Sequence, residues 1–99
     1  MNIAIPDSMA MPRSEATAFA AFLQRMANRQ AVGSLRYGRI RAERGYMSRL
    51  MKELAAYRRT GNAEQLLNIA VYAFLESYAP ENRKAHFDPT VDSVTRRRA

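Results

Sequence analysis

The sequence predicts an all-α fold, an antiparallel bundle of three main helices per chain that is completed by oligomerisation. Apolar residues recur at the three- and four-residue spacing of amphipathic helices in three segments. A link of only three residues, Thr-Gly-Asn, joins the second segment to the third, which favours a helix hairpin. The third segment is apolar around most of its circumference, so three short helices alone would leave part of it in water, which predicts a homo-oligomer.

Residues 1–12 are expected to form an N-terminal arm, because two prolines bracket a segment without any sustained period. The helical domain is predicted over residues 13–80, and its first helix over residues 14–30. Ser14 is a suitable N-cap, and an acidic residue follows it in the first turn. The predicted apolar stripe of this helix consists of Phe19, Phe22, Leu23 and Met26.

Residues 33–45, GSLRYGRIRAERG, contain three glycines and four arginines. This pattern is consistent with a connecting loop, or with a loop followed by the first turn of the second helix. The glycine spacing matches neither GxGxxG nor a P-loop, and no strand pattern precedes it. Backbone N–H groups and guanidinium groups of such a loop can surround a phosphate, although a solvated basic loop would have the same composition.

The second helix is predicted over residues 43–59 and the third over residues 62–79. Gly61 suits a left-handed C-cap position, and Asn62 suits an N-cap, with Gln65 three residues on as in a capping box. Pro80 prevents the third helix from continuing. The stripe expected to be buried in the second helix consists of Met47, Leu50, Met51, Leu54 and Ala55.

Residues 81–99 are expected to be an extended or disordered basic tail, since they show no period and end in Arg96, Arg97, Arg98 and Ala99. Phe87 is expected to pack back onto the bundle. His86 is the only histidine, and a lone histidine beside an aromatic residue is more often a packing or capping group than a ligand or a catalyst.

The absence of cysteine excludes disulfides, thiolate metal sites and cysteine nucleophiles, and fits a reducing, cytoplasmic location. The longest apolar run is far too short to span a membrane. No HExxH motif and no nucleophile paired with a base occurs, so no catalytic residue is predicted.

Charge is the strongest feature of the composition: sixteen basic residues, fourteen of them arginine, face nine acidic ones. Ten of the basic residues lie within residues 25–59, against two acidic ones. Because the guanidinium group binds pairs of phosphate oxygens, the bias favours a phosphate-bearing ligand, although a GC-rich genome would also favour arginine.

The segment KELAAYRRTGNAEQLLNIAVYAFLESYAP, residues 52–80, resembles the helical core of the MazG-like all-α nucleoside triphosphate pyrophosphohydrolases. The likeness is greatest to short, often phage-encoded relatives with a tyrosine, a Thr-Gly-Asn turn and an LLxxAxYA pattern. RYG at residues 36–38 and AHF at residues 85–87 fit the same resemblance. In that family, an ExxE and an ExxD motif on neighbouring helices hold Mg²⁺ against the triphosphate.

This chain departs from that pattern. The second acidic pair falls on Gln65 and Asn68, which are neutral, and only Glu53 remains near the first pair. The resemblance therefore implies a nucleotide pocket with a poor magnesium site. Mg²⁺ is expected only if the pocket is catalytic, and no other cofactor is expected. The predicted ligand-binding residues are Arg36, Arg39, Arg41, Arg49, Lys52, Glu53, Gln65, Asn68 and Tyr72.

The favoured function is thus binding of a nucleotide or another phosphate-bearing small molecule, with sequestration rather than efficient hydrolysis. Three alternatives stay open: a MazG-like pyrophosphohydrolase, a non-specific nucleic-acid-binding protein whose basic segment follows a phosphate backbone, and a helical interaction protein whose charge maintains solubility. No membrane partner is expected.

Overall fold

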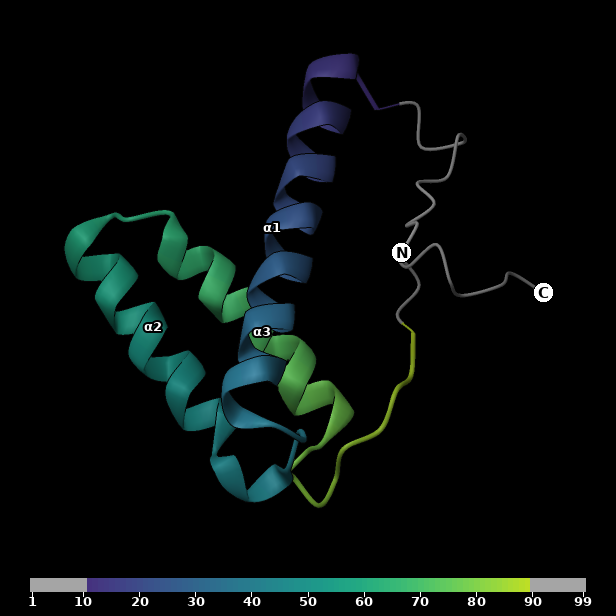
Figure 1. Cartoon of the computed structure of the whole chain (residues 1–99), viewed down its shortest axis with the longest axis vertical. Coiled ribbons are helices and arrows are strands. Elements are labelled where there is room, and N and C mark those ends of the chain that lie inside the picture. Colours follow the sequence, from purple (N-terminus) through teal and green to yellow (C-terminus); the bar gives the residue numbers. More distant parts are fainter. Residues whose placement is uncertain (1–10, 90–99) are drawn as a thin grey trace.

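The computed structural model describes residues 11–89, and every regular element in this range is helical. The elements are α1 (Arg13–Tyr37), a short 3₁₀ helix η2 (Ala42–Arg44), α2 (Tyr46–Thr60) and α3 (Glu64–Tyr78). Figure 1 shows α1 as the longest helix, with α2 and α3 beside its C-terminal half. Helix α3 packs against both α1 and α2. The all-α prediction is confirmed for the described residues.

Helix α1 is longer than predicted at both ends. It begins at Arg13, directly after Pro12, and no side chain caps it, so the prediction of Ser14 as N-cap was wrong. It continues through Gly33 for a further turn and ends where Gly38 adopts a φ of 76°. A glycine in a helix interior costs only about 1 kcal/mol relative to alanine, which the packing of the last turns offsets.

In the link between α2 and α3, the structure confirms the predicted C-cap of α2 but not the predicted N-cap of α3. Gly61 has φ 72° and ψ 10°, and its N–H donates to the carbonyl of Tyr57 at 2.7 Å, which confirms the left-handed C-cap. Asn62 lies outside α3, although its Oδ1 accepts the N–H of Glu64 at 3.0 Å. Gln65 accepts a hydrogen bond from the Thr60 hydroxyl at 2.7 Å, so no capping box forms.

Helix α2 also begins later than predicted, at Tyr46, because Gly45 adopts a left-handed conformation and separates it from η2. Its stripe is only partly buried. Leu50 and Leu54 are half-buried, whereas Met47, Met51 and Ala55 are exposed, contrary to the prediction. Periodicity identifies the apolar face of a helix, but it does not determine whether the same chain covers that face.

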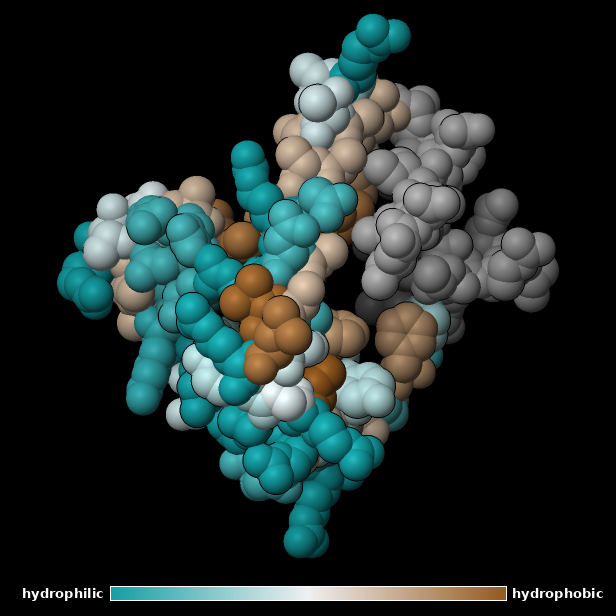
Figure 2. Space-filling view, viewed as in Figure 1, coloured by the Kyte–Doolittle hydropathy of each residue, from teal (hydrophilic) through white to brown (hydrophobic). Residues whose placement is uncertain are grey.

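The core of the described chain is small. Tyr46, Leu67 and Val71 are the described residues that are buried. Helix α3, which the sequence predicts to need partners on most sides, keeps Leu66 and Phe74 exposed. Figure 2 accordingly shows apolar side chains at several places on the surface.

The two predicted terminal segments are only partly described. Residues 1–10 of the arm and residues 90–99 of the tail, with its arginine run, lie outside the described residues. Residues 80–89 contain no helix, and Phe87 is 81% exposed, so its predicted packing onto the bundle was wrong. No helix among residues 11–89 is both long enough and apolar enough to cross a membrane.

Candidate functional site

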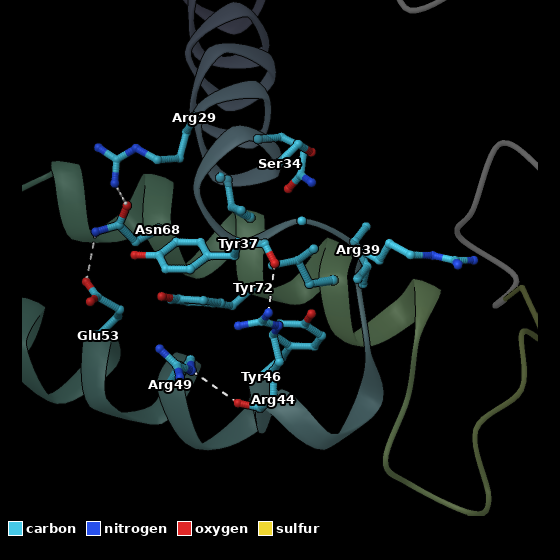
Figure 3. A pocket seen from close by; sticks show the side chains of 16 residues that line it. Arg29, Ser34, Tyr37, Arg39, Arg44, Tyr46, Arg49, Glu53, Asn68 and Tyr72 are labelled. Carbon is cyan, nitrogen blue, oxygen red and sulfur yellow. Dashed lines mark hydrogen bonds between the residues drawn. The ribbon is translucent and has the colours of Figure 1, made fainter.

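A cavity of about 310 Å³ lies where the C-terminal half of α1, the turn after it, the first two turns of α2 and the middle of α3 meet (Figure 3). Helix α1 contributes Arg29, Gly33 and Tyr37, which share a face because they are four residues apart. Arg49 and Glu53 of α2 have the same spacing. Pockets for small organic ligands span roughly 300–1,000 Å³, so this cavity is large enough for a compact ligand.

One side of the cavity carries a hydrogen-bonded network that joins all three long helices (Figure 3). Asn68 of α3 is its centre. Its Oδ1 accepts from Nη1 of Arg29 on α1, and its Nδ2 donates to Oε1 of Glu53 on α2 at 3.1 Å. Nη2 of Arg29 forms an ion pair with Glu64. The guanidinium group of Arg29 is therefore already bonded to two protein acceptors.

The aromatic rings of three tyrosines line the cavity. Tyr46 is only 4% exposed, and its hydroxyl oxygen accepts the backbone N–H of Arg41 at 3.1 Å, which fixes the turn after α1. Tyr72 is half-buried, and Tyr37 is exposed at the end of α1. Together with aliphatic side chains, these rings can contact the flat face of an organic ligand. The aliphatic lining residues are Ile40, Val71 and Leu75.

The arginines of the cavity differ in how many of their nitrogens are already bonded. Nη2 of Arg44 donates to the carbonyl of Tyr37 at 2.7 Å, and its guanidinium lies 5.7 Å from the centroid of the Tyr37 ring. Arg49 donates through Nε to the carbonyl of Arg44 at 3.2 Å. Within residues 11–89, the two terminal nitrogens of Arg49 have no acceptor. Figure 3 shows the side chain of Arg39 pointing away from the cavity.

A second, more open hollow adjoins the cavity. Arg44, Arg49, Glu53 and Tyr72 line both, and Lys52 lines only the second. Lys52 forms no ion pair with any described residue. Since Lys52 follows Arg49 by three residues on α2, their cationic groups border the same hollow. These two side chains form the basic edge of the site.

The structure places five of the nine predicted ligand-binding residues around the cavity, and it places Lys52 at the adjoining hollow. The five are Arg39, Arg49, Glu53, Asn68 and Tyr72.

The other three predicted residues lie elsewhere. Arg36 is exposed and does not line the cavity. Arg41 is also exposed and pairs with Glu43 at 3.7 Å. Gln65 is bonded to Thr60 beside the α2–α3 link. These three residues therefore do not line the cavity, and their role in binding stays a prediction.

Sequence reasoning missed the part of the site that α1 supplies. It ended the first helix at residue 30 and read Gly33 as part of a loop, so Arg29, Gly33 and Tyr37 were not seen as one face. Their spacing of four residues was the available signal. The buried Tyr46 was also missed, because the second helix was predicted to begin three residues too early.

Among the described residues, no group of three or more His, Cys, Asp or Glu side chains is close enough to hold a metal ion. Among residues 11–89, Glu53 is the only carboxylate that lines the cavity, and one of its oxygens is bonded to Asn68. The arrangement is thus suited to holding an anionic ligand by hydrogen bonds from cationic groups.

The chain matches no protein-family model, no curated protein and no solved structure.

Proposed function

We propose that this chain binds a nucleotide, or another phosphate-bearing small molecule, between its three long helices and holds it without efficient hydrolysis. The observation that carries the proposal is the basic edge formed by Arg49 and Lys52, whose terminal nitrogens have no acceptor among residues 11–89. A guanidinium fork and an ammonium group both bind phosphate oxygens. Tyrosine rings beside them suit the flat part of the ligand.

Within this proposal the lining residues have different roles. Arg49 and Lys52 bind the phosphate, and Tyr37 and Tyr72 contact the ring of the ligand. Asn68 holds Arg29 and Glu53 in place, because its amide is already bonded to both. Asn68 is therefore a positioning residue in this proposal.

Binding is favoured over hydrolysis by the small number of carboxylates. Magnesium chemistry of the MazG-like kind depends on several carboxylates around one ion, since Mg²⁺ demands oxygen ligands in near-octahedral geometry. Here Glu53 is the single carboxylate of the described part of the chain that lines the cavity. We accordingly propose kinship with the MazG-like enzymes for the scaffold, and loss of efficient catalysis for this chain.

Exposed arginines outside the cavity favour a second candidate, non-specific binding of nucleic acid. Arg36, Arg58 and Arg59 are exposed and lie away from the cavity. Such side chains can follow a phosphate backbone, with an affinity that falls steeply as salt is added. A short DNA duplex is therefore the necessary comparator in any test.

We also propose that the helices form an antiparallel bundle completed by further copies of the same chain. The described part of one chain buries only three side chains and leaves ten large apolar side chains exposed. A domain of this size needs more buried apolar surface to be stable alone. Other copies of the same chain are the partner that is present wherever the chain itself is made, and in equal amount.

A thermal-shift panel of mono-, di-, tri- and cyclic nucleotides, each with Mg²⁺ and with EDTA, tests the proposed function. We expect one nucleotide class to raise the melting temperature, and the rise to survive EDTA. At a hundredfold excess over the dissociation constant, a ligand stabilises the fold by about 2.7 kcal/mol. No rise with any nucleotide, or a rise with duplex alone, would overturn the proposal. Rapid Mg²⁺-dependent release of pyrophosphate would instead favour the alternative that the chain is a MazG-like pyrophosphohydrolase.

A further inference from the structure

The cavity and the adjoining hollow differ in the side chains that only one of them has. Ser48 and Lys52, which are both polar, line only the hollow. Aliphatic side chains line only the cavity, among them Val71 and Leu75, together with the ring of Tyr37. A ligand that spans the two spaces therefore finds a polar, basic environment for its phosphate in the hollow and apolar surface for its flat ring in the cavity.

Four side chains line both spaces and form the boundary between them. They are Arg44, Arg49, Glu53 and Tyr72. Glu53 is the one carboxylate of the described chain at this boundary, and a carboxylate repels a phosphate. The phosphate is therefore expected on the side of Arg49 and Lys52, and a different part of the ligand must meet Glu53.

Arg49 and Glu53 carry opposite charges and are four residues apart on α2, a spacing at which such side chains commonly form an ion pair. Within residues 11–89 they form none with each other. Nε of Arg49 is bonded to the carbonyl of Arg44, and Oε1 of Glu53 is bonded to Asn68 (Figure 3). Each charge is thus held by a different neighbour, and its remaining hydrogen-bonding atoms are available to a ligand.

The second carboxylate oxygen of Glu53, Oε2, accepts no hydrogen bond from any described residue. It is also accessible, because the buried side-chain atoms that lack a partner in the described chain are Nε of Arg44 and Oε1 of Glu76. An ionised carboxylate accepts hydrogen bonds and donates none. The ligand must therefore offer an O–H or N–H group about one helical turn from its phosphate.

In a nucleotide, the group at this position is the sugar. The sugar joins the phosphate to the base, so it lies at the boundary when the phosphate is in the hollow and the base is in the cavity. A ribose has two free hydroxyl groups that can donate, at its 2′ and 3′ positions, and a carboxylate is a common acceptor for a ribose hydroxyl in nucleotide-binding proteins. A 2′,3′-dideoxyribose offers neither group.

We propose that the ligand is a ribonucleotide, and that Glu53 selects it by accepting a hydrogen bond from a ribose hydroxyl at the boundary between the hollow and the cavity. The inference rests on the proposed function and adds the identity of the sugar. Asn68 is the positioning residue of this contact, because its Nδ2 holds one oxygen of Glu53 and leaves the other for the ribose.

Isothermal titration calorimetry in EDTA tests the sugar contact. The probes are the four ribonucleoside 5′-monophosphates and 5′-triphosphates, each beside its 2′,3′-dideoxy counterpart. For at least one base, the parent chain should bind the ribonucleotide roughly tenfold to a hundredfold more tightly than the dideoxynucleotide. Equal affinities for the two sugars would overturn the inference and leave the proposed nucleotide binding intact.

The Glu53→Gln variant shows whether the carboxylate makes the contact. It keeps the size of the side chain and removes the charge, so the preference for ribose should fall to a few-fold. Binding of the dideoxynucleotide should stay the same or tighten, because one negative charge near the phosphate is gone. Glu15→Gln, an equal change of charge at an exposed position that lines neither space, is the matched control and should alter neither affinity.

Three results would overturn the role of Glu53. In Glu53→Gln, these are an equal loss of affinity for both sugars, or an undiminished preference for ribose. The third is a preference for one base in both sugar forms that Glu53→Gln removes, since the carboxylate would then bond the base. Absence of any binding would also overturn the inference, and together with no rise in the thermal-shift panel it would overturn the proposed function as well.

Discussion

Arg29 and Arg49 are the same type of side chain and line the same cavity, but their hydrogen bonds give them different roles. Both terminal nitrogens of Arg29 are bonded to protein oxygens, one to Asn68 and the other to Glu64. Arg49 uses Nε for a backbone carbonyl and leaves its two terminal nitrogens without an acceptor in the described chain. A phosphate therefore finds unoccupied donors at Arg49 and occupied ones at Arg29.

We expect Arg49→Ala and Lys52→Ala each to weaken binding of the phosphate-bearing ligand by roughly tenfold to a hundredfold. A hydrogen bond to a charged group contributes about 1.5–3 kcal/mol. Isothermal titration calorimetry measures the change. Arg58→Ala is the matched control on the same helix, since Arg58 is exposed and distant from the cavity. An equal loss in all three variants would instead favour the nucleic-acid candidate.

Asn68 makes a different prediction, because it bonds to protein groups. Asn68→Ala removes one hydrogen bond to Arg29 and another to Glu53, so half-buried Glu53 loses its bond to α3 and Arg29 keeps only its ion pair with Glu64. We expect the free energy of unfolding to fall by about 1–3 kcal/mol in urea denaturation. Asn82→Ala, in the segment after α3, should change it by less than about 0.5 kcal/mol. Equal effects would show that the network does not support the fold.

At the scale of the elements, Gly61 and Gly33 show what a sequence can and cannot reveal. Gly61 was placed correctly, because a left-handed cap after an amphipathic helix has a nearly unique residue preference. Gly33 was misread, because a glycine interior to a helix looks the same as a loop glycine. Docking of α1 on α3 decided between the two, and that contact lies far along the chain.

The two glycines predict opposite effects for the same substitution. An added Cβ meets no atom within 4 Å at either position, so only the backbone matters. Gly61→Ala should destabilise the fold by about 1–2 kcal/mol, because φ is 72°. Gly33→Ala should stabilise it by about 0.5–1 kcal/mol, because alanine is the better helix former. Thermal melts of the two variants should move in opposite directions; a shared direction would contradict these helix boundaries.

The candidate site was predictable where it depends on the link between α2 and α3. That link is short, so the spacing along the two helices placed Glu53, Asn68 and Tyr72 near one another. The contribution of Arg29 and Tyr37 depends on how α1 packs, which no local pattern specifies. The exposure of Met47 and Met51 was equally unpredictable, since an apolar stripe looks the same whether its partner lies in the same chain or in another.

For the whole molecule, the small core makes stability depend on concentration. Only Tyr46, Leu67 and Val71 are buried among residues 11–89. If copies of the chain cover the remaining apolar surface, association contributes to folding by mass action. We expect the melting temperature to rise as the concentration increases from about 1 μM to 100 μM. A melting temperature independent of concentration would contradict an obligate oligomer, and light scattering should agree with either outcome.

The position of α1 also has a kinetic consequence. Only residues 61–63 separate α2 from α3, so contacts between those two helices are local and form early. Helix α1 reaches α3 across the whole of α2, and the cavity does not exist until that docking is complete. A ligand that recognises the finished cavity therefore acts after the rate-limiting barrier. In stopped-flow experiments it should slow unfolding and leave the refolding rate unchanged.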